Sequence, residues 1–411
     1  MDIATSLFIV GFVIILGLIA QFMFKRLRIP DVLILIIFGA LLSHFGLAGS
    51  VKAGGDQITF LVIFSLIYVV FYGALPIRLK AIFSTMKYAF FSSLLNLIAI
   101  TSLIGIISYL IGFNWVLALS LGALFCVLDG SIINSLLETI KVGKKAEAQI
   151  QIESAIIDIL VIVGILSIIN FSAMNFNQIL QSLINYLFLS FGIGLFVAII
   201  WAFALKHIGH YSSAPIATMA ILVMVYAFAE YVTANGVITV FSFSIVLGNM
   251  TLLSKLFYEE QKEGIAVLSV STKSFFRDIS FLIRTFLFVY LGILVDFTQW
   301  GWLLIGLAFF LIAYLLRSFI GKLIVNKRLR KKEIYFLDAM CAKGLTPTVI
   351  LAVIQGDAFF ANIVVGGIFF SVLITSILIL LIEKNKFTSG ANIIFKIVKK
   401  IKKHHTHSRK K

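Results

Sequence analysis

The chain has 411 residues, of which 61% are hydrophobic and 13% are charged, and its formal net charge is +16 at neutral pH. A soluble domain of this size needs more polar surface than this composition supplies, which excludes the water-soluble class. Long apolar runs, in place of short alternating segments, exclude an outer-membrane barrel. We therefore expect an all-α polytopic membrane protein, because helices satisfy their own backbone hydrogen bonds in lipid.

Thirteen apolar stretches reach the length of roughly 20 residues that a helix needs to cross a bilayer. Short turns must separate two closely spaced pairs of them, one at Asn114 and the other at Asn235-Gly236. The predicted spans are 5–24, 31–49, 57–74, 86–111, 114–137, 149–170, 178–205, 215–234, 236–253, 279–297, 301–324, 334–354 and 362–382.

Lysine and arginine are concentrated in alternate loops of this topology. One set of loops contains nearly all of them, including the run "NKRLRKKE" at 326–333, whereas the opposite set contains only Lys52. The positive-inside rule then places the N-terminus outside and the C-terminus in the cytoplasm of a cell-membrane protein. The first span is expected to be uncleaved, because its flanking basic residues follow it.

The same charge bias explains the net charge without a nucleic-acid partner. The C-terminal tail, 383–411, is basic and has isoleucines at helical spacing, so we predict a cytoplasmic amphipathic helix on anionic lipid. Cys126 and Cys341 show no paired spacing, which gives no support for a disulfide or a metal site. No hydrolase or transferase constellation is visible in the sequence, so we expect neither an enzyme nor a cofactor.

Five ionisable residues interrupt the apolar spans: Asp129, Glu153, Asp158, Arg317 and Lys343. A charge at the bilayer centre costs about 2.5–3.5 kcal/mol on insertion scales. Residues of this kind usually mark an ion pathway. The pattern therefore predicts a protein that moves a cation.

The odd number of spans suggests an inverted repeat, in which spans 1–6 correspond to spans 8–13 around a linking helix at 178–205. The fifth and twelfth spans then correspond, and they carry Asp129 and Lys343, each followed by a glycine. Glycine and the nearby Pro347 weaken a helix, so we predict two crossed discontinuous helices. Asp129 would compensate positive helix ends and Lys343 negative ones. A simple Asp–Lys ion pair between packed helices is the alternative.

The segment "ESAIID" at 153–158 supplies the candidate ion-binding residue. Ser154 lies one helical turn before Asp158 on the same face, whereas Glu153 points about 140° away. We predict that Asp158 and Ser154, assisted by Asp129 and the backbone carbonyl of Leu128, bind a monovalent metal cation. An aspartate that only hydrogen-bonds to a neighbouring helix is the alternative.

Glu153 is predicted to pair with Arg317. Arginine stays protonated in proteins, so this charge pair would be structural and would not carry protons.

These motifs resemble the monovalent cation:proton antiporter superfamily, nearer its sodium/proton exchanger branch. The Thr-Asp-Pro of the family's first broken helix is matched by Leu128-Asp129-Gly130, and its Glu-Ser-x-x-Asn-Asp by residues 153–158. Further similar segments are "AFAEYVTANGVITVFSFSIVLGN" at 227–249, "FLFVYLGILVDF" at 286–297, Arg317, and "AKGL" at 342–345. The chain differs from the family pattern by Leu128 in place of Thr, Gly130 in place of Pro and Ile157 in place of Asn.

The resemblance implies an antiporter-like fold over residues 1–382 and a homodimer. It also implies elevator-like movement of a core (about 86–170 and 301–382) against a scaffold (about 5–74 and 215–297), with 178–205 as the linking helix. The expected function is exchange of sodium, or potassium, for protons. With Ile157 and Arg317 at their positions, Asp158 is the one evident proton carrier, so we expect electroneutral exchange.

Two alternatives belong to other functional classes. A sodium-coupled symporter of a small organic anion shares crossed broken helices, but it needs a polar pocket beside the ion site. A non-transporting membrane scaffold is the other alternative, and it would be unaffected by Asp158→Asn.

Overall fold

The computed structural model describes residues 3–27, 31–46, 55–75, 79–130, 132–133, 143–170, 176–208, 211, 213–250, 270–294, 299–324, 329–354 and 358–383. All regular secondary structure in these ranges is helical, which confirms the all-α prediction. The helices are α1 (Ile3–Leu27), α2 (Asp31–His44), α4 (Gly55–Ala74), α5 (Leu79–Ile111), α6 (Trp115–Leu124), α8 (Lys144–Asn170), α9 (Phe176–Ile208), α10 (Ala214–Tyr231), α11 (Gly236–Gly248), α13 (Val270–Leu294), α14 (Trp300–Leu323), α15 (Lys331–Ala339), α16 (Leu345–Ile354) and α17 (Ala358–Glu383).

Each predicted span coincides with a helix or with a broken helix. Six described stretches are long and apolar enough to cross a membrane: Tyr88–Ile111, Lys145–Ile165, Leu187–Leu205, Ala214–Tyr231, Trp300–Leu323 and Ala358–Ile382. Two helices begin well before the predicted spans, α5 at Leu79 and α13 at Val270. Hydropathy marks only the part of a helix that lies in hydrocarbon, whereas backbone hydrogen bonding continues into the polar region beyond it.

The two short turns are present where they were predicted. Asn114 caps α6 by accepting a hydrogen bond from the Leu117 amide at 2.8 Å, and Asn235 caps α11 through the Ile238 amide at 3.0 Å. An asparagine at this position satisfies one of the free amide groups of the first helical turn. Both turns therefore end one helix and start the next within a few residues.

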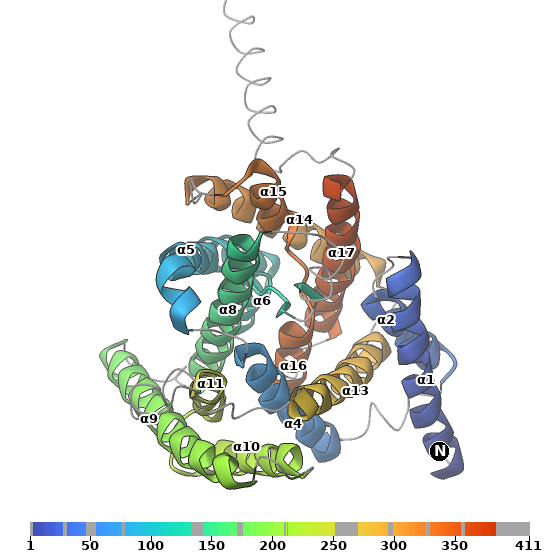
Figure 1. Ribbon diagram of the computed structural model, residues 1–411. Helices are drawn as coiled ribbons and strands as arrows, with labels where there is room; N and C mark the ends of the chain where they lie inside the picture. The colour runs from blue at the N-terminus through green and yellow to red at the C-terminus, as the bar shows by residue number, and fades with distance from the viewer. Residues whose placement is uncertain are drawn as a thin grey trace, which may run out of the picture.

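The helices fall into groups that are visible in Figure 1. Helices α1, α2 and α13 lie together on one side of the molecule, and α9, α10 and α11 lie on another. Gly39 of α2 and Gly292 of α13 allow their helices to approach so closely that a Cβ atom at either position would collide with backbone of the other helix. Helices α5, α6, α8, α14, α15 and α17 lie in the upper part of Figure 1, and α4 lies between α11 and α13.

The fifth and twelfth predicted spans are both interrupted. Helix α6 ends at Leu124 and the chain is helical again at Gly130, while α15 ends at Ala339 and α16 begins at Leu345. The two interruptions meet, because the Asp129 amide donates a hydrogen bond to the Ala342 carbonyl at 2.9 Å. The two broken helices therefore cross at these residues; most of the second half of the first, 134–142, lies outside the described residues.

Candidate ion-binding site

Asp129 lies at the start of two half-helices. One carboxylate oxygen, Oδ1, accepts a hydrogen bond from the Ile132 amide at 3.0 Å, and Oδ2 accepts one from the Leu345 amide at 2.5 Å. Gly344 packs so tightly against this carboxylate that a Cβ atom there would collide with it. Asp129 thus places a negative charge where two positive helix N-termini come together.

Lys343 supplies the positive charge at the crossing, opposite in sign to Asp129. Its side chain is buried, and its Nζ donates a hydrogen bond to the Val127 carbonyl at 2.8 Å, in the non-helical stretch after α6. The Lys343 amide donates to Ser371 Oγ at 2.9 Å, so α17 also holds the second interruption in place. The ammonium group thus compensates a carbonyl that the interrupted helix leaves without a helical partner.

Asp158 lies beside this crossing, on α8. Asp129 and Lys343 are both close enough to act on its carboxylate electrostatically, and the Thr346 side chain of α16 lies next to it. The Oδ1 atom of Asp158 is buried and has no hydrogen-bond partner within the described part of the chain. A buried carboxylate oxygen in this condition is a position where a proton or a cation can bind.

The other predicted ligands lie near the same interruption. Ser154 is buried and donates its hydroxyl to the Gln151 carbonyl at 3.1 Å, and its Oγ is 3.2 Å from where a Cβ on Gly130 would lie. Leu128 lies in the non-helical stretch with its side chain buried, so only its backbone can offer an oxygen. These are hard oxygen donors, the type that alkali cations and other hard cations prefer.

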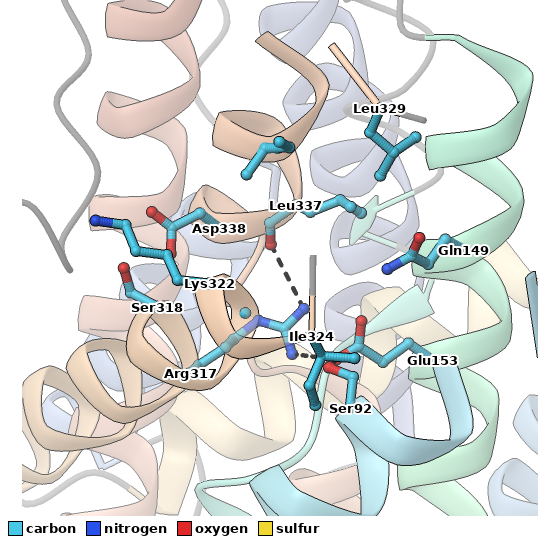
Figure 2. A pocket seen from close by; sticks show the side chains of 12 residues that line it. Ser92, Gln149, Glu153, Arg317, Ser318, Lys322, Ile324, Leu329, Leu337 and Asp338 are labelled. Atoms are coloured by element: carbon cyan, nitrogen blue, oxygen red, sulfur yellow. Dashed lines mark hydrogen bonds and ion pairs between the residues drawn. The ribbon is translucent and has the colours of Figure 1, made fainter. Parts of the chain in front are cut away.

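Glu153 and Arg317 form a buried ion pair with 2.7 Å between Glu153 Oε1 and Arg317 Nη1 (Figure 2). Ser92 of α5 donates to the same carboxylate oxygen at 2.9 Å, and Arg317 Nη2 lies 3.5 Å from the Leu337 carbonyl of α15. The pair therefore joins α8, α14 and their neighbours at the wall of a pocket. Because arginine stays protonated, Glu153 is permanently paired with a positive charge, which is not the case for the carboxylate of Asp158.

A second ion pair between described helices was not foreseen from the sequence. Arg284 of α13 and Asp31 of α2 approach to 2.9 Å, and each side chain is about one-tenth exposed. Asp31 also accepts a hydrogen bond from the Val32 amide at 3.1 Å, so its carboxylate binds both the first turn of α2 and Arg284 of α13.

Sequence reasoning missed four contributors: Val127, Ser371 and Thr346 at the crossing, and Ser92 at the ion pair of Glu153 with Arg317. The Val127 contact uses a backbone oxygen, which any residue type would provide. The other three are hydroxyl residues in apolar helices, where most hydroxyls bond to a carbonyl one turn earlier. The one available signal was Thr346, which stands next to Pro347 and directly after the predicted interruption.

Comparison with known proteins identifies the family. A sequence model of the transmembrane sodium/hydrogen exchanger family matches residues 11–384. The chain belongs to the sodium/hydrogen exchanger family. This confirms the resemblance noted from the motifs and agrees with a multi-pass membrane protein of a transporter family.

Individual relatives within this family are distant. The K(+)/H(+) antiporter NhaP of Alkalimonas amylolytica is 21% identical over 278 residues, which cover 64% of this chain and 47% of the relative. The chain thus spans about half the length of that curated relative.

The solved structures of the sodium proton antiporter MjNhaP1 from Methanocaldococcus jannaschii have the same fold as this chain. The structure at pH 8 superposes with a TM-score of 0.76 at 18% identity, covering 94% of this chain and 98% of that one. A structure from an electron-microscopy map gives a TM-score of 0.71, also at 18% identity, over 93% and 96%. The antiporter-like fold with crossed broken helices is thereby confirmed.

Proposed function

We propose that this protein exchanges a monovalent cation, sodium or alternatively potassium, for protons across the cell membrane. Asp158 carries either ion in turn, and Ser154, the Leu128 carbonyl and Asp129 complete the site. The observation that carries the proposal is the buried Asp158 oxygen without a hydrogen-bond partner among the described residues, next to the crossing. Membership of the sodium/hydrogen exchanger family supports the same conclusion.

Exchange follows from the cost of burying a bare carboxylate. An ionised Asp158 without a counter-ion is unfavourable in a low-dielectric site, whereas a bound proton or a bound cation neutralises it. The site can therefore cross the membrane only when one of the two occupies it. A proton moving one way obliges a cation to move the other way.

Two other described carboxylates near the crossing are already engaged. Both oxygens of Asp129 accept backbone hydrogen bonds, and Glu153 is paired with Arg317. Asp158 is left as the carrier, so one proton exchanges for one monovalent cation without net charge movement.

The movement that we propose is elevator-like. Helices α5, α6, α8 and α14 to α17 form the core, and α1, α2, α4, α10, α11 and α13 form the scaffold, linked by α9. Helix α4 packs against α16. Under this proposed division, their contact is one that the movement would have to change, beside the second interruption. Cysteine pairs cross-linked between α4 and α16, in a variant without Cys126 and Cys341, should stop exchange. Pairs between α14 and α17, both in the core, should not; equal effects of the two cross-links would contradict this movement.

The remaining expectations concern the surroundings of the protein. We propose a homodimer with the N-terminus outside and the C-terminus in the cytoplasm. The basic tail, 383–411, is proposed to bind anionic lipid; it lies outside the described residues except for Glu383.

The deciding experiment uses purified protein in liposomes that enclose a pH-sensitive dye. Adding Na⁺, K⁺ or Li⁺ outside should dissipate an imposed pH gradient with wild-type protein and not with Asp158→Asn. The control is Glu230→Gln, because Glu230 caps α11 through the Gly236 amide at 2.8 Å and a glutamine oxygen can still do so. Dissipation by Asp158→Asn at the wild-type rate would refute the proposal.

A further inference from the structure

Within the described residues, the first half of the chain offers few side-chain oxygens to a cation at this site. Leu128, at the first interruption, has a buried apolar side chain. Ser154 has a hydroxyl, but its proton is directed to the Gln151 carbonyl. Asp129 has both oxygens on backbone amides. A small cation that sheds its water at Asp158 needs further oxygen ligands.

Thr346 provides an oxygen from the second half of the chain. It is the second residue of α16, it is 4% exposed, and its side chain lies next to the Asp158 carboxylate where α16 packs against α8. The start of α16 is fixed in this place, because the Leu345 amide is bound to Asp129 and Gly344 lies against the same carboxylate. The Thr346 hydroxyl is therefore held at the crossing by backbone contacts on the residues that precede it.

We propose that Thr346 is a ligand of the transported cation and helps to determine which monovalent cation is preferred. This rests on the function proposed above. A hydroxyl can serve both loading states, since it has one proton to donate and two lone pairs. It donates to Asp158 when the carboxylate is without a cation, and it turns a lone pair to the ion when a cation is bound. The number and strength of such oxygen dipoles decide between cations of different size.

Thr348 supplies a matched control on the same helix. Its hydroxyl donates to the Gly344 carbonyl at 2.8 Å, the ordinary arrangement for a threonine within a helix. Both threonines are buried. Replacing either by valine removes one hydroxyl and retains the branched shape, so the two variants differ in whether the lost hydroxyl faces Asp158.

The test is the apparent KM for Na⁺, K⁺ and Li⁺ in the liposome assay, for Thr346→Val and Thr348→Val. Because hydrogen-bond-type contacts with a charged group are stronger than neutral ones, Thr346→Val should raise the KM for the preferred cation about tenfold or more. The ratio of the KM values for Na⁺ and K⁺ should change with it. The maximal rate at saturating cation should stay within about threefold, because Asp158 remains. Thr348→Val should keep the wild-type KM values.

Further variants separate this inference from the function on which it rests. Thr346→Ser keeps a hydroxyl and should keep near-wild-type KM values, whereas Thr346→Ala should repeat the effect of valine. Comparing the KM values of Thr346→Ser and Thr346→Ala tests the ligand role even if the valine variant does not fold. If Asp158→Asn is inactive and every Thr346 variant has wild-type KM values, the ligand role of Thr346 is wrong while the antiporter function stands. Equal KM increases for Thr346→Val and Thr348→Val would also overturn it.

Discussion

The Nζ atom of Lys343 lies 2.8 Å from the carbonyl oxygen of Val127, and this contact joins the two interruptions of the crossed helices. It complements Asp129, whose carboxylate accepts the amides of Ile132 and Leu345. Each charged side chain thus hydrogen-bonds to the backbone at the interruption in the other half of the chain: Lys343 to a carbonyl and Asp129 to an amide. The two interruptions are stable because Asp129 and Lys343 bind the backbone groups that the broken helices leave without helical partners.

Replacing Lys343 by methionine should destabilise the protein. The substitution leaves the Val127 carbonyl without its charged donor, which costs about 1.5–3 kcal/mol. The melting temperature of the detergent-solubilised protein should fall, and exchange should be lost with it. Lys332→Met, on the exposed surface of α15, is the control and should melt like wild type. An unchanged melting temperature for Lys343→Met would mean that the ammonium group does not support the crossing.

How much of this arrangement the sequence predicts depends on the kind of atom involved. Hydropathy located the spans, and glycine and proline located the interruptions, because both act on the backbone through local rules. The ion pair of Glu153 with Arg317 could be anticipated, since each is a buried charge that needs an opposite partner. The partner of Lys343 could not be anticipated, because a backbone carbonyl looks the same at every position.

The hydrogen-bond partners of hydroxyl residues are equally hard to predict from the sequence. Ser93 donates to the Ala89 carbonyl of its own helix at 2.7 Å and reaches only the backbone carbonyl of Glu153, at 3.4 Å, whereas its neighbour Ser92 donates to the Glu153 carboxylate at 2.9 Å. Only the rotation of α5 against α8 separates these two roles, and that rotation is set by tertiary packing. For the same reason, the contact of Thr346 with Asp158 became visible only in the folded chain.

The pair of Glu153 and Arg317 should behave as a mutually dependent unit. Removing one member of a buried pair leaves an uncompensated charge and costs about 3–5 kcal/mol, whereas replacing both by apolar residues is often close to neutral. Glu153→Leu and Arg317→Met should each lower the melting temperature, and the double variant should recover much of the loss.

A surface pair provides the comparison for this double-mutant cycle. Arg277 and Asp278 lie 3.6 Å apart with both side chains mostly exposed, so Arg277→Met should cost less than about 1 kcal/mol. The folded double variant of Glu153 and Arg317 should still exchange cations, because neither residue carries the ion. A double variant that melts as low as the sum of the single changes would show that the pair is not coupled.

Exchange should not respond to membrane potential. Asp158 is the one carboxylate at the crossing that we assign to ion carriage, so one positive charge moves in each direction. Imposing an inside-negative potential with valinomycin and a potassium gradient should leave the rate of sodium-driven pH change unaltered. The same liposomes with a protonophore added confirm that the potential is present. A rate that rises steadily with potential would require a second carrier, and Asp129 would be the first residue to test.

Two glycine substitutions should have opposite effects on stability. At Gly344 an added Cβ would collide with the Asp129 carboxylate, so Gly344→Ala must displace either Asp129 or the start of α16. Both movements break the hydrogen bond of the Leu345 amide to Asp129, and leaving a buried polar group unpaired costs about 1–3 kcal/mol. The melting temperature should fall and exchange should be lost.

Gly164, within α8, is the matched position, because a Cβ there would meet no atom within 4 Å. Alanine is favoured over glycine inside a helix by about 1 kcal/mol, so Gly164→Ala should melt at or slightly above the wild-type temperature. It should also exchange cations at the wild-type rate. The comparison isolates the crossing from the general effect of adding a methyl group to a membrane helix. If the two alanine variants melted alike, Gly344 would not be required for the approach of α16 to Asp129.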